Sequence, residues 1–115
     1  MKNDKVIEVK SYDFAKRIVN VYKFLISNNE FILSKQLLRS GTSIGANVIE
    51  AQYAISKKEF RNKMSIALKE AVESRFWINL LTDTDFLTYS QAKSLLDDLE
   101  EIIKILVKIV KNANI

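Results

Sequence analysis

Apolar side chains recur along almost the whole chain with the period of amphipathic α-helices. Strict alternation of apolar and polar residues, which a half-buried strand would show, is never sustained, and the sequence contains no proline. Four stretches have the helical period, with short polar segments between them. They run from about Ser11 to Ser27, from about Glu30 to Ile55, from Ser56 to about Leu81, and from Thr88 onwards.

Local signals mark where these helices begin and end. Ser56 is followed three residues later by Glu59, and Thr88 by Gln91, which is the spacing of a capping box at a helix N-terminus. Asn28-Asn29 favours a turn between the first two helices. Because short connections make neighbouring helices antiparallel, the pattern predicts an all-α protein, an antiparallel up-down-up-down four-helix bundle. We expect residues 1–10 to be an N-terminal arm, Ser11 to cap the first helix, and residues 11–115 to form one bundle domain.

Both glycines of the chain lie inside the second predicted helix, at Gly41 and Gly45. A glycine in a helix interior costs roughly 1 kcal/mol relative to alanine. Their spacing of four places them on one helical surface, where the missing side chains let another backbone approach. The pair therefore predicts close packing of the second helix against a neighbour.

Composition narrows the function classes. The 115 residues carry a formal net charge of +4 and include no cysteine and no histidine, which removes thiol nucleophiles, imidazole bases and the usual zinc ligands. We expect no cofactor and no metal. No segment reaches the length of an apolar membrane span and the first residues do not resemble a signal peptide. The expected location is the cytoplasm, without membrane association.

The charges are unevenly distributed. A basic cluster is the candidate nucleic-acid-binding site, although a solvated helical face would look the same. It consists of Lys57, Lys58, Arg61 and Lys63. An acidic cluster lies in the fourth helix at Asp97, Asp98, Glu100 and Glu101.

A polar stripe follows the second predicted helix, and we interpret it as a structural hydrogen-bonded network rather than a ligand surface. Its members are Gln36, Arg39, Ser43, Asn47 and Glu50. Counting antiparallel residues outward from the turn at Ser56 places Arg39 level with Glu73, so we expect an ion pair between them across the second and third helices.

More apolar residues are present than one bundle core needs, which indicates self-association. The candidate oligomer interface comprises Ile66, Trp77, Ile105 and Ile109; the alternative is a wide core that buries them. Enzymatic interpretations are weak. The acidic cluster lacks the histidines of a di-iron bundle, and Ser43 with Lys69 is a poor imitation of a serine–lysine dyad without an evident oxyanion hole. We therefore predict no catalytic residues and no enzyme.

The central motif at residues 36–51, QLLRSGTSIGANVIEA, resembles the signature of the four-helix bundle proteins called 23S rRNA intervening sequence proteins. SKKEF at 56–60 and IALKEA at 66–71 extend the resemblance. It implies a five-fold ring of bundles. A related branch, the accessory variability proteins of diversity-generating retroelements, implies association with a reverse transcriptase and with RNA or DNA. The resulting expectation is a non-enzymatic homopentameric scaffold with a nucleic-acid role; the alternative is a protein-interaction adaptor that binds no nucleic acid directly.

Overall fold

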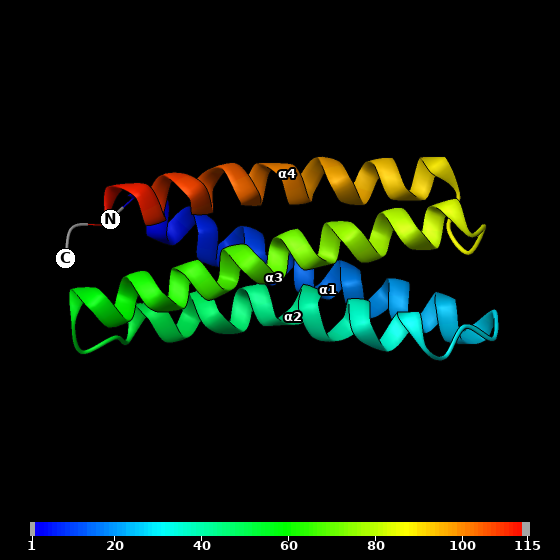
Figure 1. The fold of residues 1–115 in the computed structure, drawn as a ribbon, viewed down its shortest axis with the longest axis horizontal. Helices are drawn as coiled ribbons and strands as arrows, with labels where there is room; N and C mark the ends of the chain where they lie inside the picture. Colours follow the sequence, from blue (N-terminus) through cyan, green and yellow to red (C-terminus); the bar gives the residue numbers. More distant parts are fainter. Residues whose placement is uncertain (1, 114–115) are drawn as a thin grey trace.

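Four α-helices make up the part of the chain that the computed structural model describes, residues 2–113 (Figure 1). They are α1 (Lys2–Ser27), α2 (Leu33–Gln52), α3 (Lys57–Asp83) and α4 (Tyr89–Asn112). Successive helices run antiparallel in a rod of 45 × 20 × 19 Å. Each helix packs closely against two others: α1 and α3 each pack against α2 and α4. Among the described residues, the backbones of the diagonal pairs α1–α3 and α2–α4 do not approach closely. The predicted up-down-up-down bundle is confirmed.

The core is a continuous column of apolar side chains from all four helices. Phe14 and Ile18 of α1, Ile44 of α2 and Met64 of α3 are at most 1% exposed, as the periodicity predicts. Ile55 is the exception, because the pattern predicts it at the end of the core stripe and it is 94% exposed. The reason is that α2 ends at Gln52, so Ile55 lies in the turn beyond the last helical residue.

The predicted N-terminal arm is wrong, because α1 already begins at Lys2. Ile7 is fully buried, one heptad before Phe14, and so extends the core face by two helical turns. Ser11 is not a cap but a core position, 1% exposed, whose hydroxyl donates to the carbonyl of Glu8. A small residue is needed there because Gly45 of α2 lies against its backbone.

The glycine pair of α2 is the closest point of the α1–α2 contact. A Cβ on Gly41 would lie 2.8 Å from Cγ1 and Cγ2 of Ile18, and a Cβ on Gly45 would lie 3.3 Å from the carbonyl oxygen of Ser11. Both distances are shorter than ordinary van der Waals contact. The prediction that the glycines admit a neighbouring helix is confirmed, and that neighbour is α1.

Side-chain caps begin α3 and α4 as predicted. The Ser56 hydroxyl accepts a hydrogen bond from the backbone of Glu59, and Thr88 forms the complete capping box with Gln91. In the first cap the Glu59 carboxylate accepts from the backbone of Ile55 instead of from Ser56. Both sets of interactions satisfy N–H groups that a helix leaves without internal partners.

The other two turns share one solution. Asn29 and Asp85 have φ values of 66° and 69°, in the left-handed region. Just after each of them a backbone N–H reaches back five residues, from Glu30 to Leu25 and from Phe86 to Leu81. These are Schellman motifs, in which an asparagine or aspartate takes the position usually held by glycine.

Candidate nucleic-acid interface

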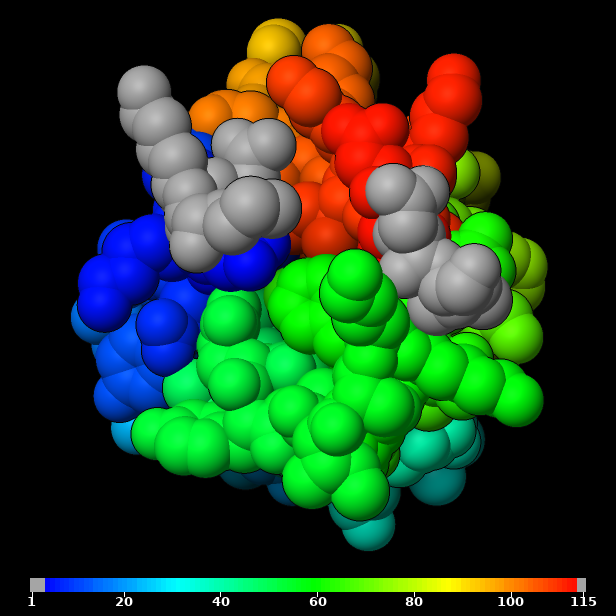
Figure 2. Space-filling model, turned by 90° about the vertical axis from the view of Figure 1, so that its left-hand side faces the viewer, coloured from blue at the N-terminus to red at the C-terminus, as the bar shows by residue number. Residues whose placement is uncertain are grey.

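One end of the rod gathers the α2–α3 turn, the start of α1 and the end of α4 (Figure 1). Viewed from that end, the turn lies between the first described residues of the chain and the last (Figure 2). Lys57 and Lys58 occupy the first turn of α3 here, and both are exposed. We call this region the basic end.

Not all of the predicted basic cluster is available to a ligand. Arg61 is half-buried and its Nε donates to the carbonyl of Val110, 3.3 Å away, which ties α3 to the end of α4. Lys63 forms an ion pair of 2.7 Å with Glu50, and the hydrogen bond to that carboxylate raises the pKa of Lys63. Within residues 2–113, Lys57 and Lys58 take part in no ion pair. These two lysines are therefore the predicted members best placed to bind an anion.

The structure adds lysines that the sequence interpretation missed. Lys108 and Lys111 from the last turns of α4, and Lys5 from the start of α1, are exposed at the same end of the rod. The sequence could have indicated the two α4 lysines. Counting antiparallel residues outward from the α3–α4 turn places Val110 level with Arg61, and Lys108 and Lys111 are close to Val110 in the sequence. The opposite end instead carries the aspartates Asp83 and Asp85 beside the α3–α4 turn. Two exposed lysines, Lys23 and Lys35, lie near that end as well.

The predicted polar network on α2 does not join helices as expected. Ser43 Oγ donates to the Arg39 carbonyl and the Asn47 side chain donates to the Ser43 carbonyl, both within α2. Gln36 and Arg39 are exposed. Among the residues that the structure describes, Glu50 is the one member of the stripe that forms an ion pair or a side-chain hydrogen bond with another helix, through Lys63. The stripe lies on the rim of the α2–α3 seam, where short polar side chains bond to their own helix.

The predicted ion pair between Arg39 and Glu73 is wrong. Glu73 Oε2 instead accepts a hydrogen bond of 2.8 Å from Nε1 of Trp77, one turn along α3. The pKa of Glu70 is raised, chiefly by burial and then by the negative charge of Glu73. The positive charge of Arg39 lowers this pKa, but by less than the other two effects raise it. Oε1 of Glu70 is buried and accepts no hydrogen bond from the residues that the structure describes.

A buried polar contact that the sequence interpretation missed does link α2 and α3. Ser40 and Ser74 are both fully buried, and their hydroxyl oxygens lie 2.9 Å apart. The same hydroxyl of Ser74 is 2.9 Å from the Glu70 carbonyl. The apolar periodicity of α2 correctly predicts that Ser40 faces the seam; its partner cannot be named without the register of the two helices.

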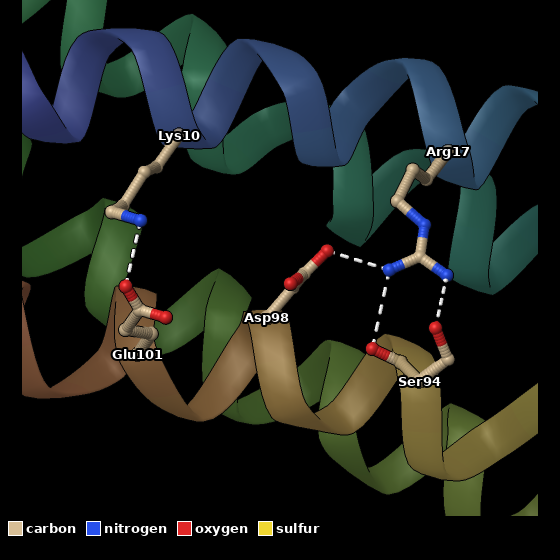
Figure 3. Close-up of polar contacts among 5 residues, drawn as sticks. All are labelled: Lys10, Arg17, Ser94, Asp98 and Glu101. Atoms are coloured by element: carbon tan, nitrogen blue, oxygen red, sulfur yellow. Dashed lines mark hydrogen bonds and ion pairs between the residues drawn. The ribbon is translucent and has the colours of Figure 1, made fainter.

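The acidic cluster of α4 is used in ion pairs with other side chains. Glu101 binds Lys10 of α1 at 2.6 Å, and Asp98 binds Arg17 of α1 at 2.5 Å (Figure 3). Arg17 also donates to the backbone carbonyl and the hydroxyl of Ser94, so that it spans one turn of α4.

The two remaining carboxylates of the cluster are paired as well. Glu100 accepts two hydrogen bonds from Arg75 of α3, at 2.8 and 2.9 Å. Asp97 binds Lys93, one turn earlier in α4. Three of the four carboxylates therefore link α4 to its neighbours, Asp98 and Glu101 to α1 and Glu100 to α3, while Asp97 is paired within α4.

The candidate oligomer residues divide into two groups. Ile109 is 7% exposed and belongs to the core, so its assignment to an interface is wrong, and Ile105 packs against the core from a half-buried position. Ile66 is 40% exposed, and Trp77 is half-buried beside the more exposed Phe76, with ring centroids 5.0 Å apart. Of the four candidates, those with exposed or half-exposed apolar surface away from the core thus lie on α3, whereas the two on α4 pack into or against the core.

Comparison with known proteins places this arrangement in a family. The model of the 23S rRNA-intervening sequence protein family matches residues 3–108. The chain belongs to this family. A crystal structure of a protein with unknown function from the S23 ribosomal protein family of Bacteroides thetaiotaomicron is similar, with 51% identity and a TM-score of 0.94. The match covers 96% of this chain and 99% of that one. No curated protein matches.

Membership in the 23S rRNA-intervening sequence protein family confirms the resemblance carried by the central motif on α2. The function of the solved Bacteroides relative is itself unknown, so that relative supplies a fold and no activity. None of the helices described in this chain has the length and apolarity needed to cross a membrane.

Proposed function

We propose that this protein is a non-enzymatic, self-assembling scaffold that holds RNA or DNA at its basic end. The observation that carries the proposal is the gathering of exposed lysines from three helices around the α2–α3 turn. These lysines are Lys5, Lys57, Lys58, Lys108 and Lys111. The family resemblance adds a ring of five copies, in which the basic ends would repeat.

Binding at this end is expected to be electrostatic. Lysines that neutralise phosphates release condensed counterions, so affinity falls steeply as salt rises and depends little on base sequence. Long lysine side chains on helix ends act as point charges and do not read base edges. The proposal therefore predicts that RNA and duplex DNA of equal length bind with similar affinity.

Self-assembly is supported by apolar side chains left at the surface of a single copy. Phe76 is 56% exposed and Ile66 40% exposed on α3, and Tyr12 and Val9 are 64% and 54% exposed on α1. Scattered exposed apolar residues are ordinary, but clusters of this size mark contact surfaces.

The same surfaces favour a second candidate, an adaptor that binds a partner protein such as a reverse transcriptase and no nucleic acid directly. The exposed Phe76–Trp77 pair supports it, since aromatic residues are enriched at protein interfaces. The two functions differ in one measurable property, the response to lysine charge at the basic end.

A charge-reversal experiment separates them. Binding of a fluorescent RNA hairpin and a DNA duplex is measured by anisotropy from about 25 to 200 mM salt, values on the order of those over which phosphate contacts are lost. The test variant carries Lys57→Glu and Lys58→Glu. The matched control carries Lys23→Glu and Lys35→Glu, two exposed lysines close to the α1–α2 turn at the opposite end, with the same change in net charge.

If the scaffold proposal holds, the basic-end variant should bind nucleic acid about tenfold more weakly or worse. Its affinity should also depend less on salt, because each lost phosphate contact lowers the slope of log affinity against log salt concentration by about one. The control should bind within about twofold of wild type. Equal weakening by both variants would show a response to net charge alone, and no binding by wild type at low salt would favour the adaptor.

A further inference from the structure

A shallow hollow of about 680 Å³ lies at the basic end, between the α2–α3 turn and the end of α4. Its apolar lining from the turn and the start of α3 includes Ala54, Ile55 and Phe60, and α4 contributes Asn112 and Ala113. We call this region the end hollow. Its volume is ample for a single flat ring system such as a nucleobase.

Two side chains give the end hollow its apolar character. Phe60 packs against the core and also lines the hollow, so the fold holds an aromatic ring at this place. Ile55 is 94% exposed, because α2 ends at Gln52, and its side chain adds nothing to the core. An aromatic ring held against the core beside an exposed isoleucine is a surface on which a flat apolar group can pack.

Arg61 joins the two sides of the end hollow. Its Nε donates to the Val110 carbonyl at 3.3 Å, which fixes the start of α3 beside the last turns of α4. The hollow is therefore formed by the folded chain itself. A site that exists before binding loses less freedom when a ligand enters it.

Lysines flank the end hollow on both sides. Lys57 lines it, and Lys58 follows in the first turn of α3. Lys108 and Lys111 are exposed in the last turns of α4. Cations in the first turn of a helix oppose the helix dipole, so Lys57 and Lys58 do not stabilise α3 through it. Their positive charge is available to an anionic ligand.

The carboxylates at this end do not cancel these lysines. Glu59 is the one acidic residue within 57–61 and 108–113, and its carboxylate already accepts a hydrogen bond from a backbone N–H. Asp4 and Glu8 line a separate hollow beside α1. Among the residues that the structure describes, no acidic side chain lines the end hollow. Its charge therefore complements a polyanion.

A nucleic-acid strand combines the two kinds of chemistry that this surface would bind, flat bases and a chain of phosphates. We propose that the end hollow takes one unpaired base, which packs against Phe60 and Ile55 while neighbouring phosphates lie on Lys57 and Lys111. The Asn112 amide, which both donates and accepts hydrogen bonds, lines the hollow beside the edge of that base.

This inference rests on the proposed function and narrows its ligand to strands with unpaired bases. Bases within a duplex are paired and stacked on one another, so they do not reach the end hollow. Fully paired RNA and DNA are then bound through their phosphates alone and with similar affinity. A single strand or a loop gains the stacking contact in addition.

Removing the bases from the ligand separates stacking from charge. Fluorescence anisotropy compares a DNA single strand of about eight nucleotides, within the site size of one small domain, with a strand of equal length that is abasic throughout. Wild type should bind the base-bearing strand about tenfold more tightly, the order of the contribution of one stacked base. Equal affinities would overturn the proposal, because any polyanion, including an acidic protein segment, would then serve as well.

Ile55→Ser tests the end hollow itself. Because Ile55 is exposed and lies outside the helices, the bundle should still fold, which circular dichroism verifies. The variant should bind the base-bearing strand several-fold more weakly and the abasic strand as wild type does. Ile32→Ser is the matched control, since Ile32 is 72% exposed in the turn before α2, and it should change neither affinity. The same result for both variants would place the base elsewhere.

The lysines provide the comparison with the proposed function. Lys57→Glu with Lys58→Glu should weaken binding of the base-bearing and the abasic strand by the same factor, since both strands carry the same phosphates. If the lysine variant weakens both strands and Ile55→Ser weakens neither, the electrostatic site stands and the end hollow is not part of it. If wild type binds neither strand at low salt, the proposed function itself fails.

Methyl NMR gives an independent measurement of where the base lies. The Ile55 methyl resonances are assigned by their absence from the spectrum of Ile55→Ser. The ring current of a stacked base should shift them when the base-bearing strand is added, and the abasic strand should not. Binding of the base-bearing strand without this difference would show that the end hollow stays empty and would overturn the proposal.

Discussion

Single residues decide how closely α1 and α2 approach. Gly41 leaves room for the fully buried Ile18, and Gly45 leaves room for the backbone at Ser11. The spacing of the glycines in the sequence predicts a close helix contact. Two glycines on the same face of one helix are costly unless their missing side chains let a neighbour approach. The spacing does not name the neighbour, because the matching feature on α1 is only a serine at a core position.

Gly41→Ala should destabilise the fold although alanine is the better helix former. The gain in helix propensity is about 1 kcal/mol, and overpacking a fixed core costs about 1–3 kcal/mol. Three atoms of Ile18 lie within 3.2 Å of the added methyl, and a β-branched side chain has little freedom to move. We expect a net loss of up to about 2 kcal/mol by urea unfolding.

Gly45→Ala is the matched control, since the closest atom to its methyl, the Ser11 carbonyl oxygen, lies 3.3 Å away. The gain in helix propensity of about 1 kcal/mol should offset this milder contact, so we expect Gly45→Ala to remain within about 0.5 kcal/mol of wild type. The explanation also requires coupling to Ile18. In a double-mutant cycle, Ile18→Ala should reduce the cost of Gly41→Ala. Strictly additive effects at the two positions would contradict the steric argument.

Helix starts show what local sequence can and cannot predict. Ser56 and Thr88 are recognisable because a hydroxyl cap acts within three residues of itself. The predicted start of α1 is wrong because Ser11 has the residue type of a cap but the location of a core residue. The predicted start of α2 at Glu30 lies three residues before the first helical residue, Leu33.

Glu30 in fact caps α2 from outside the helix. Its carboxylate is 6% exposed and accepts hydrogen bonds from the backbone N–H groups of Ile32, Leu33 and Ser34. Burial raises the pKa of Glu30, but these three hydrogen bonds outweigh it, so that the net pKa is lowered. A carboxylate at a helix N-terminus also interacts favourably with the helix dipole.

Glu30→Gln should cost about 1–2 kcal/mol at pH 7, the usual range for losing a cap. A folded-state pKa below the unfolded value of about 4.3 means that the stabilisation is complete above that pH. It is lost as the pH falls through the lowered pKa. Denaturant unfolding at pH 7 and near pH 3 should therefore show the gap between wild type and Glu30→Gln closing at low pH.

Glu70→Gln is the control, because it should change stability in the opposite direction. The pKa of Glu70 is raised, chiefly by burial and then by Glu73. The charged form is thus disfavoured in the fold, and stability falls as the pH rises from the unfolded value through the raised one. Removing that charge should stabilise the protein at pH 7 and have no effect at low pH. A pH-independent gap for Glu30→Gln would contradict its role as an ionised cap.

At the scale of the whole molecule, topology and register are more predictable than surface detail. Counting outward from the Ser56 turn places Arg39 level with Glu73, and the observed contacts between Ser40 and Ser74 and between Glu50 and Lys63 differ from that count by one or two residues. The predicted ion pair fails because Arg39 is exposed and its charge acts on Glu70, while the Glu73 carboxylate accepts a hydrogen bond from Trp77 instead. Axial position follows from chain length, whereas the direction of a long side chain depends on packing.

The basic end is predictable only in part for the same reason. Lys57 and Lys58 are adjacent in the sequence and are recognisable there as a basic pair. Lys5, Lys108 and Lys111 come near them only in the folded bundle. Lys63 belongs to the predicted cluster although Glu50 neutralises it. A charge cluster read from sequence thus includes paired residues and omits those that other helices contribute.

Assembly and nucleic-acid binding should be coupled if one copy presents only a few lysines. Each basic end is then a weak site, and an oligomer binds a long strand with an effective concentration that raises its affinity by about 10²-fold or more. Phe76→Asp changes an exposed apolar residue of α3 and leaves Lys57 and Lys58 intact, yet it should weaken binding to a long RNA by at least about tenfold, because it weakens self-assembly. Anisotropy at constant chain concentration measures this loss.

The length of the RNA is the internal control for this coupling. An oligonucleotide of about eight residues lies within the site size of one small domain, so it reaches a single basic end. Wild type and Phe76→Asp should bind that short RNA equally, while Lys57→Glu with Lys58→Glu weakens both the short and the long complex. If Phe76→Asp reduced short- and long-strand binding by the same factor, Phe76 would contact nucleic acid itself, and avidity would not explain the affinity of the assembly.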